Sequence, residues 1–238
     1  MTVNIVQAKG ALEGALKETA RKIFAVFKTK RSDESLTIGL CGGRSVVGLL
    51  GALLEESHNQ PKDLLARIHF FMVDERLVPL TDEQSNYGGL RKLLFDRLVS
   101  EGAISVEQLH PFDPNPSLSD YGCAGYMGEL IKFGGSFTVV VVGVGEDGHI
   151  AGLFPGHPSL NNPLKGFLAF HDSPKPPAGR MTASAPLIES ADLAVALLLG
   201  EGKRDAWSAF NAAQSTVATC PALLAKAARS CLVVTDLA

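Results

Sequence analysis

The chain has 238 residues, of which 46% are hydrophobic and 20% charged, and its formal net charge is −3. A chain of this length, with this proportion of hydrophobic to charged residues, can bury a sizeable core. Intrinsic disorder is therefore excluded for most of the chain. The mild acidity argues against a broadly basic surface that would bind nucleic acid or anionic lipid, but it leaves room for a local cationic pocket.

The cysteines and the apolar runs set further limits. Cys41, Cys123, Cys220 and Cys231 lie far apart without a C-x-x-C pair, which argues against a zinc site or a dense disulfide framework. The first residues lack the pattern of a signal peptide, and the longest apolar runs are far shorter than the roughly 20 residues that span a bilayer. We therefore expect a cytoplasmic protein with reduced thiols and with no membrane or nucleic-acid partner.

Short β-branched runs alternate with helical patterns, which predicts an α/β fold with a mainly parallel, Rossmann-like sheet flanked by helices. In chain order, the pattern predicts helix 11–27, strand 36–41, helix 46–55, strand 68–73, helix 85–99 with Ser85 as its cap, helix 121–131, strand 137–142, strand 192–199, helix 201–212 and strand 231–235. The proline-rich stretch 154–179 is interpreted as a mostly irregular connection. No composition break marks a linker, so we expect a single domain over residues 1–238.

Three polar loops follow predicted strands at the sheet edge where parallel sheets bind ligands. In the first loop, Gly42, Gly43, Arg44 and Ser45 follow the strand 36–41 and open a helix. Paired glycines let backbone N–H groups approach an anion, and the start of a helix adds positive potential. The same glycines also suit an ordinary tight turn, so both interpretations stay open.

The second loop, Asp74-Glu75-Arg76, follows the strand 68–73. Three charges directly after an apolar strand are typical of a solvated strand end. The loop is nevertheless expected on the same edge as the first one, where the planar guanidinium of Arg76 suits phosphate. Arg76 is therefore a candidate for binding an anionic substrate.

The third loop follows the most apolar strand and carries a formal G-x-G-x-x-G match at Gly143, Gly145 and Gly148. This pattern is typical of dinucleotide-binding proteins when it lies in a first βαβ unit. Here it lies past the middle of the chain, and Pro155 limits the predicted helix after it to about two turns. The glycine pattern is therefore weak evidence for a dinucleotide cofactor.

Two side chains of the third loop, Asp147 and His149, are more informative. Histidine is the usual general base near neutral pH, and a neighbouring carboxylate can orient its ring and stabilise the imidazolium. Asp147 also suits the cap of the short helix, and the two roles are compatible. The sequence has no G-x-S-x-G nucleophile elbow and no H-x-x-x-H zinc pair.

A fourth stretch, 172–180, carries Lys175 and Arg180 on a segment that its prolines favour in an extended conformation. By itself it is typical of an exposed loop. The remaining histidines have no partner at a meaningful spacing, and among them His157 is the best candidate for a role in the site because it is close to the third loop.

Taken together, these motifs resemble the 6-phosphogluconolactonase family. The signatures at 42–45, 73–79 with 85–87, 143–158 and 173–182 occur in the family's order and span essentially the whole chain. The first loop departs from the common pattern, because Cys41 and Val46 stand where the family often has a serine and a proline. This departure leaves the details of that turn open.

The resemblance implies the fold of sugar-phosphate isomerases and lactonases. It also implies hydrolysis of 6-phospho-D-glucono-1,5-lactone to 6-phospho-D-gluconate in the oxidative pentose phosphate pathway, without a cofactor or a metal. The expected partner is this small-molecule lactone, and the chain is expected to be a monomer or a weak homo-oligomer.

The resemblance further implies roles for individual residues. His149 would activate the attacking water, and Asp147 would orient it. The expected substrate-binding residues would supply charge to the phosphate or the developing oxyanion, or backbone donors at the first turn: Gly43, Arg44, Ser45, Asp74, Arg76, Lys175 and Arg180.

Two alternatives remain open at this point. Glucosamine-6-phosphate deaminases share the G-x-G-x-D-G-H loop, but they carry an acidic residue where this chain has Phe154 and a tyrosine where it has Arg76. A non-catalytic sugar-phosphate sensor is the second alternative. The segment before residue 36 is too short for the DNA-binding helices that such a regulator would need.

Overall fold

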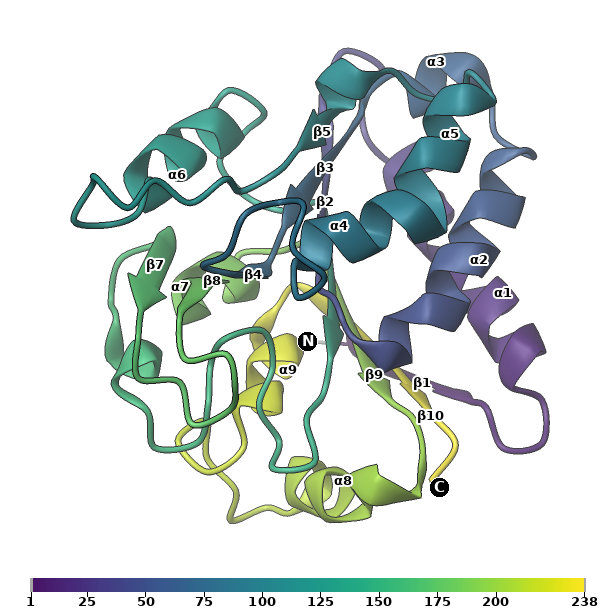
Figure 1. The fold of residues 1–238 in the computed structure, drawn as a ribbon. Coiled ribbons are helices and arrows are strands. Elements are labelled where there is room, and N and C mark those ends of the chain that lie inside the picture. Colours follow the sequence, from purple (N-terminus) through teal and green to yellow (C-terminus); the bar gives the residue numbers. More distant parts are fainter. Residues whose placement is uncertain (1, 238) are drawn as a thin grey trace.

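The computed structural model describes residues 2–237. Within them, seven strands form an entirely parallel sheet in the order β1-β10-β9-β6-β2-β3-β5 (Figure 1). These strands are β1 Thr2–Gln7, β2 Leu36–Leu40, β3 Ile68–Met72, β5 Leu109–His110, β6 Val139–Gly143, β9 Leu193–Leu198 and β10 Ser230–Thr235. The predicted mainly parallel sheet is confirmed.

The central strands are covered on both faces, which explains their apolar sequences. Every residue of β2 and β9 is buried, as are the four valines of β6. When helices cover both faces of a parallel sheet, neither face of its strands is solvated. The sequences of these strands are therefore continuous hydrophobic runs.

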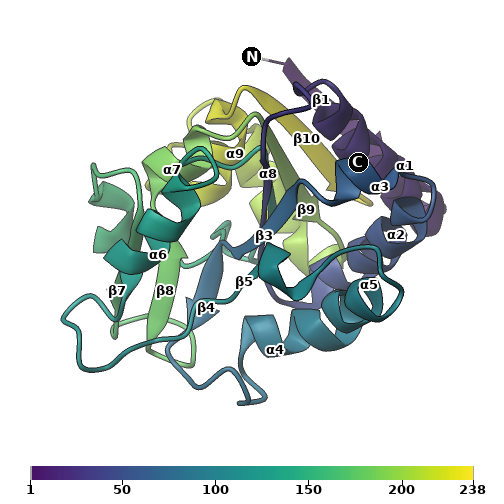
Figure 2. The same cartoon turned by 90° about the horizontal axis from the view of Figure 1, so that it is seen from above.

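The helices lie on both faces of this sheet (Figure 2). One face is covered by α1, α2 and α5, and the other by α6, α7 and α9. The α-helices in the described residues are α1 Leu12–Lys28, α2 Val47–Ser57, α3 Lys62–Leu65, α4 Asn86–Leu90, α5 Asp96–Ser100, α6 Cys123–Ile131, α7 Ala185–Glu189, α8 Arg204–Asn211 and α9 Leu224–Ala227. Among them, none is long and apolar enough to cross a membrane.

The five predicted helices are confirmed with small shifts of their ends. The predicted helix 85–99 consists of α4 and α5 joined by a π-helical turn over Arg91–Phe95. As expected, the Ser85 hydroxyl caps it by accepting a hydrogen bond from the backbone N–H of Gly88.

A second, antiparallel sheet has the order β4-β8-β7 and lies beside α6 and α7 (Figure 1). It consists of β4 Asp74–Arg76, β7 Phe167–Phe170 and β8 Arg180–Ala183. The stretch 154–179 is mostly irregular, as predicted, apart from a 3-10 turn over Pro158–Asn161 and the strand β7, which pairs with β8 and was not predicted. Residues of both sheets share one hydrophobic core, for example Val141 and Met181. This shared core favours the single domain, which stays a prediction.

The short helix expected after the third loop is not formed. The segment 144–153 instead makes tight turns and isolated bridges that pair Ile150 with Val144 and with Leu153. Gly148 and Ala151 both have positive φ, 82° and 50°, which no right-handed helix accommodates. Asp147 therefore caps no helix; its Oδ1 accepts a hydrogen bond from the backbone N–H of His149 within the turn.

Two neighbouring histidines of the parallel sheet give a testable pH dependence. His69 Nδ1 lies 3.0 Å from His110 Nε2, and the His110 ring stacks on Phe71. Burial lowers the pKa of His110 from 6.5 to about 4 and also lowers the pKa of His69. Between these pH values the unfolded chain binds more protons than the folded one, so the free energy of unfolding decreases as the pH falls from 6.5 to about 4.

We expect His110→Phe to make this pH dependence shallower, because it removes a group that is protonated more easily in the unfolded chain. Urea unfolding of both proteins across this pH range measures the effect. An equally steep dependence in the variant would contradict the prediction.

Candidate active site

A cavity of about 730 Å³ opens at the carboxyl ends of β2, β6 and β9, beside β4 and the loop before β8. The three predicted loops and the fourth stretch converge on it. Its lining includes every predicted site residue except Asp147: Gly43, Arg44, Ser45, Asp74, Arg76, His149, Lys175 and Arg180. The expectation that these residues share one rim of the sheet is confirmed.

The first loop passes close to α4, and this contact requires a glycine. A Cβ atom at Gly42 would lie 2.0 Å from Asn86 Oδ1. Gly43, with φ of 99°, then leads into a 3-10 turn over Arg44–Val46 that continues into α2. The Arg44 side chain is exposed at the mouth of the cavity. The tight-turn interpretation of the first loop is confirmed, and the turn also brings Arg44 to the cavity; binding of an anion by its backbone N–H groups stays a prediction.

Glu75 is a supporting residue that was not among the predicted site residues. It is fully buried, and its carboxylate accepts hydrogen bonds from the backbone N–H groups of Arg76, Asn86 and Tyr87 at 2.7 to 2.8 Å and from the Ser85 hydroxyl. Burial raises its pKa, while these backbone donors oppose the rise. Glu75 therefore fastens β4 to the start of α4 and fixes the backbone on either side of the cavity.

Asp74 and Arg76 flank Glu75 and face the cavity. Asn86 Nδ2 donates a hydrogen bond to Asp74 Oδ2 at 3.1 Å, while Asp74 Oδ1 has no hydrogen-bond partner within residues 2–237. Burial raises the pKa of Asp74, and the nearby Arg76 and Arg180 oppose this rise. Arg76 Nη1 donates to the backbone carbonyl of Gln84, and its Nε is likewise without a partner in that range. Both side chains thus keep hydrogen-bonding capacity for a ligand.

The third loop places the His149 ring over the backbone of Gly145. A Cβ atom at Gly145 would lie 1.9 Å from His149 Nδ1, so only glycine fits there. The backbone N–H of Gly145 also donates to the His149 carbonyl at 2.7 Å, which closes the turn. The G-x-G-x-x-G match therefore reflects, at Gly145, the packing of a histidine rather than the approach of a dinucleotide.

His149 and Asp147 form a short hydrogen bond, with 2.5 Å between Nδ1 and Oδ1. Because a carboxylate only accepts, we assign the ring proton to Nδ1, which leaves the Nε2 lone pair free. No residue among 2–237 is hydrogen-bonded to Nε2. This is the tautomer that a histidine general base requires.

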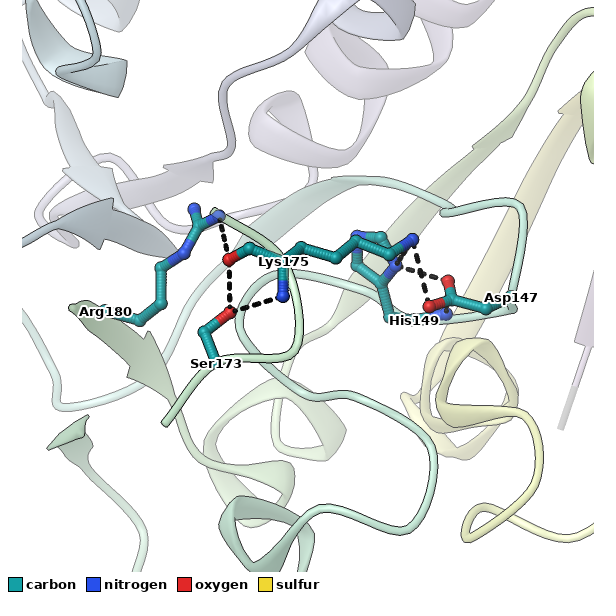
Figure 3. A network of polar contacts seen from close by, with 5 residues as sticks. All are labelled: Asp147, His149, Ser173, Lys175 and Arg180. Atoms are coloured by element: carbon teal, nitrogen blue, oxygen red, sulfur yellow. Dashed lines mark hydrogen bonds and ion pairs between the residues drawn. The ribbon is translucent and has the colours of Figure 1, made fainter. Parts of the chain in front are cut away.

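Lys175 completes the group (Figure 3). Its side chain reaches from the fourth stretch to Asp147 and His149, with Nζ 2.9 Å from Asp147 Oδ2 and 3.3 Å from His149 Nδ1. Burial raises the pKa of Asp147, but the hydrogen bonds from His149 and Lys175 outweigh it and leave the pKa at about 2. Asp147 is therefore an anion at neutral pH, held between two donors.

The pKa of His149 is set by opposing influences. Burial lowers it most, and the positive charge of Lys175 lowers it further, whereas Asp147 and, more weakly, Asp74 raise it. The outcome is a lowered pKa, so the imidazole is unprotonated at neutral pH.

The structure places Arg180 differently from the other cations. Its Nε donates to the carbonyl of Pro177 at 3.0 Å, and its Nη2 donates to the carbonyl of Pro176 at 2.9 Å. The side chain is buried, and burial lowers its pKa. Arg180 thus shapes the backbone turn that carries Lys175, and only Nη1 makes no hydrogen bond within residues 2–237.

Sequence reasoning missed Lys203, a further cation of the cavity. Burial lowers its pKa, Glu146 opposes this, and Lys175 and Arg44 add to the lowering. Lys203 follows β9, which is the neighbour of β6 in the sheet. Residues 200–203 are a polar stretch directly after a buried strand, as the first three loops are. This pattern predicts that Lys203 lies at the same edge of the sheet.

The arrangement combines a free imidazole lone pair with a cluster of cations, which suits base-assisted attack of water on an anionic substrate. Residues 2–237 contain no group of three or more His, Cys, Asp or Glu side chains placed to hold a metal ion.

The chain is similar to known proteins over most of its length. The family model for glucosamine-6-phosphate isomerases/6-phosphogluconolactonase matches residues 10–234. A 6-phosphogluconolactonase of Borreliella burgdorferi is 36% identical over 86% of this chain and 85% of its own length. A probable 6-phosphogluconolactonase of Schizosaccharomyces pombe is 32% identical over 77% of this chain and 76% of its own length.

Solved structures show the same fold. The 6-phosphogluconolactonase of Thermotoga maritima superposes with a TM-score of 0.82 at 22% identity, covering 98% of this chain and 99% of that one. The 6-phosphogluconolactonase of Trypanosoma brucei superposes with a TM-score of 0.76 at 24% identity, covering 99% and 96%. On the family match and the curated relatives, the chain belongs to the glucosamine-6-phosphate isomerase/6-phosphogluconolactonase family.

Proposed function

We propose that the chain, like the relatives named 6-phosphogluconolactonase, hydrolyses 6-phospho-D-glucono-1,5-lactone to 6-phospho-D-gluconate in the oxidative pentose phosphate pathway. The observation that carries the proposal is the Asp147–His149 hydrogen bond, which leaves Nε2 free in a cavity lined by cations. Such a pair activates water, and the cations suit a phosphorylated substrate.

In the proposed reaction, a water molecule attacks the lactone carbonyl carbon while His149 Nε2 takes one of its protons. Asp147 stabilises the imidazolium that forms, because its carboxylate already accepts the Nδ1 proton. The tetrahedral intermediate then collapses, the bond from the carbonyl carbon to the ring oxygen breaks, and the imidazolium returns the proton to that oxygen. The products are a carboxylic acid and a hydroxyl group, so the reaction needs no further reactant.

Three cations of the cavity, Arg76, Arg44 and Lys203, are assigned by their positions. Arg76 lies in the strand that pairs with β8 and has an unpartnered Nε within the described residues, so we assign it to the oxyanion of the intermediate. Arg44 and Lys203 follow β2 and β9, the two strands that flank β6. We assign them, with the backbone of Gly43 and Ser45, to the phosphate. Asp74 would accept a hydrogen bond from a sugar hydroxyl through Oδ1.

The phosphate assignment predicts a selective effect on substrate binding. Lys203→Ala is expected to raise KM by about 10- to 100-fold, since a charge-assisted hydrogen bond is lost, and to change kcat much less. Lys165→Ala serves as a control, because Lys165 is exposed and outside the cavity lining. Steady-state kinetics and the inhibition constant of inorganic phosphate measure the effect. Unchanged KM and phosphate inhibition in Lys203→Ala would contradict the assignment.

The residue Phe154 argues against glucosamine-6-phosphate deaminase activity of this chain. This residue stands where the deaminases carry an acidic group; it is 1% exposed, and its ring centroid lies 4.9 Å from that of His149. The site thus offers an aromatic surface where those enzymes have a carboxylate.

The function is tested by acid release from freshly prepared 6-phosphogluconolactone and by ammonia release from glucosamine 6-phosphate. We expect acid release well above the spontaneous rate and no ammonia. Ammonia release would favour the deaminase, and binding of the phosphosugar without turnover would favour a sensor.

We also propose a cytoplasmic location and a monomer or weak homo-oligomer. The location is supported by the four cysteines, which are all buried and free, as expected in a reducing compartment. Sedimentation of the purified chain tests the oligomeric state.

A further inference from the structure

Two segments of the chain meet beside the cavity. The segment 145–158 carries Asp147 and His149, and the loop 171–180 between β7 and β8 carries Lys175. Polar side chains join them at two places. Lys175 contacts Asp147 and His149 at the cavity, and His157 contacts Asp172 at the other place.

Hydrogen bonds on both ring nitrogens and contacts with aromatic rings hold the His157 side chain in one orientation. Its Nδ1 accepts a hydrogen bond from the backbone N–H of Ser159 at 3.1 Å, so the ring proton lies on Nε2. Nε2 lies 3.2 Å from Asp172 Oδ1 and donates to it. The ring also packs against Phe170 at 4.6 Å and meets Phe154 edge-on at 6.2 Å. Only 10% of the His157 side chain is exposed, so it is a fixed anchor.

Phe154 connects this anchor to the catalytic pair. Its ring centroid lies 6.2 Å from that of His157 and 4.9 Å from that of His149. The residues that position His149 and those that hold Asp172 therefore belong to one packed unit.

Internal hydrogen bonds set the shape of the loop 171–180, and at its end the backbone N–H of Leu77 donates to the Gly179 carbonyl at 3.2 Å. Ser173 Oγ donates to the Lys175 carbonyl at 2.8 Å (Figure 3). Arg180 donates to the carbonyls of Pro176 and Pro177. The Lys175 side chain is 40% exposed, so little packing holds it. His171, at the start of the loop, packs against Tyr121. Apart from the contacts of Lys175 itself, the hydrogen bond between His157 and Asp172 is the polar side-chain contact, within the described residues, that joins the loop to the segment that carries His149.

We propose that His157 is a positioning residue: by donating its Nε2 proton to Asp172, it holds the loop 171–180 so that the Lys175 ammonium stays against Asp147 and His149. The consequence for turnover rests on the proposed function, whereas the placement of Lys175 does not.

The proposal has a consequence for the pKa of His149. A nearby Lys175 ammonium lowers this pKa by its charge and shares the Asp147 carboxylate. When the loop is released, the ammonium moves away and Asp147 interacts with His149 alone. The pKa of His149 must then rise.

Asp172 offers a matched pair of variants, since its side chain is 72% exposed and a change there leaves the core intact. Asp172→Ala removes the acceptor, whereas Asp172→Asn keeps an acceptor oxygen for His157 Nε2. Both variants lose the same negative charge, so any direct electrostatic effect on His149 is common to them. A rise of the pKa of His149 in Asp172→Ala alone therefore reports a change of position.

The experiment is an NMR titration of the His149 ring, assigned by its absence in His149→Ala, together with steady-state kinetics. We expect the pKa of His149 to rise in Asp172→Ala and in Lys175→Ala and not in Asp172→Asn. We expect kcat to fall by about 3- to 10-fold in Asp172→Ala, as the loss of one partly exposed hydrogen bond implies. In the Lys175→Ala background, Asp172→Ala should cause no further loss, because both changes act through Lys175.

Equal pKa values of His149 in Asp172→Ala and Asp172→Asn would overturn the proposal, as would an equal loss of kcat with and without Lys175. The titration needs no turnover. A chain without lactonase activity but with the expected pKa changes would therefore refute the proposed function and leave the positioning role supported.

Discussion

Replacing His149 by alanine is expected to lower kcat for hydrolysis of 6-phosphogluconolactone by about 10²- to 10⁴-fold, the range that a positioned general base contributes. The reason is that His149 Nε2 is the group assigned to take the proton of water; its Nδ1 is already bound to Asp147. KM should change much less, because the cations that bind the substrate remain in place. Initial rates, corrected for spontaneous hydrolysis, measure this effect.

The pH dependence of kcat in the wild-type enzyme is a second test of the role of His149. Burial lowers the pKa of His149 below the ordinary value of 6.5. The base therefore stays unprotonated to a lower pH than an exposed imidazole, and kcat should decrease only when the pH falls below that ordinary value. A decrease that begins well above 6.5 would conflict with the assignment.

Asp147→Asn is expected to cause the second largest loss, about 10²- to 10⁴-fold in kcat, comparable to the loss of the orienting aspartate in a serine protease. Lys175 Nζ donates to one oxygen of Asp147, and His149 Nδ1 donates to the other. An asparagine has a single carbonyl oxygen, which Lys175 would occupy. Its amide nitrogen would then donate to Nδ1 and move the ring proton to Nε2, which blocks the base.

The control for this variant removes the competing cation. In Asp147→Asn combined with Lys175→Ala, the amide oxygen is free to turn toward Nδ1, so part of the lost kcat should return. Nearly wild-type kcat in Asp147→Asn by itself would show that the carboxylate does not set the tautomer of His149.

The parallel sheet and the position of the site could be predicted from the sequence because both follow from short-range patterns. A fully buried strand such as β6 reads as a run of valines. Polar residues after such strands must meet at one edge of the sheet, which is why Arg44, Arg76 and His149 were correctly placed around one cavity.

The parts that could not be predicted depend on contacts between distant segments. The strand β7 forms only because β8 lies beside it, and the Asp147–Lys175 contact joins residues from two such segments. The role of Arg180 in offering its charge to substrate stays a prediction, whereas its hydrogen bonds to the carbonyls of Pro176 and Pro177 depend on a loop shape that no local pattern specifies. The backbone reason for a glycine at 145 likewise appears only once the His149 ring is in place.

The most direct test of the central claim is the loss of freshly made 6-phosphogluconolactone, timed with no protein, with the wild-type chain and with His149→Ala at equal concentration. We predict rapid loss with the wild-type chain and, with His149→Ala, a rate that falls by about 10²- to 10⁴-fold toward the spontaneous one. A His149→Ala rate equal to that of the wild-type chain would contradict the account.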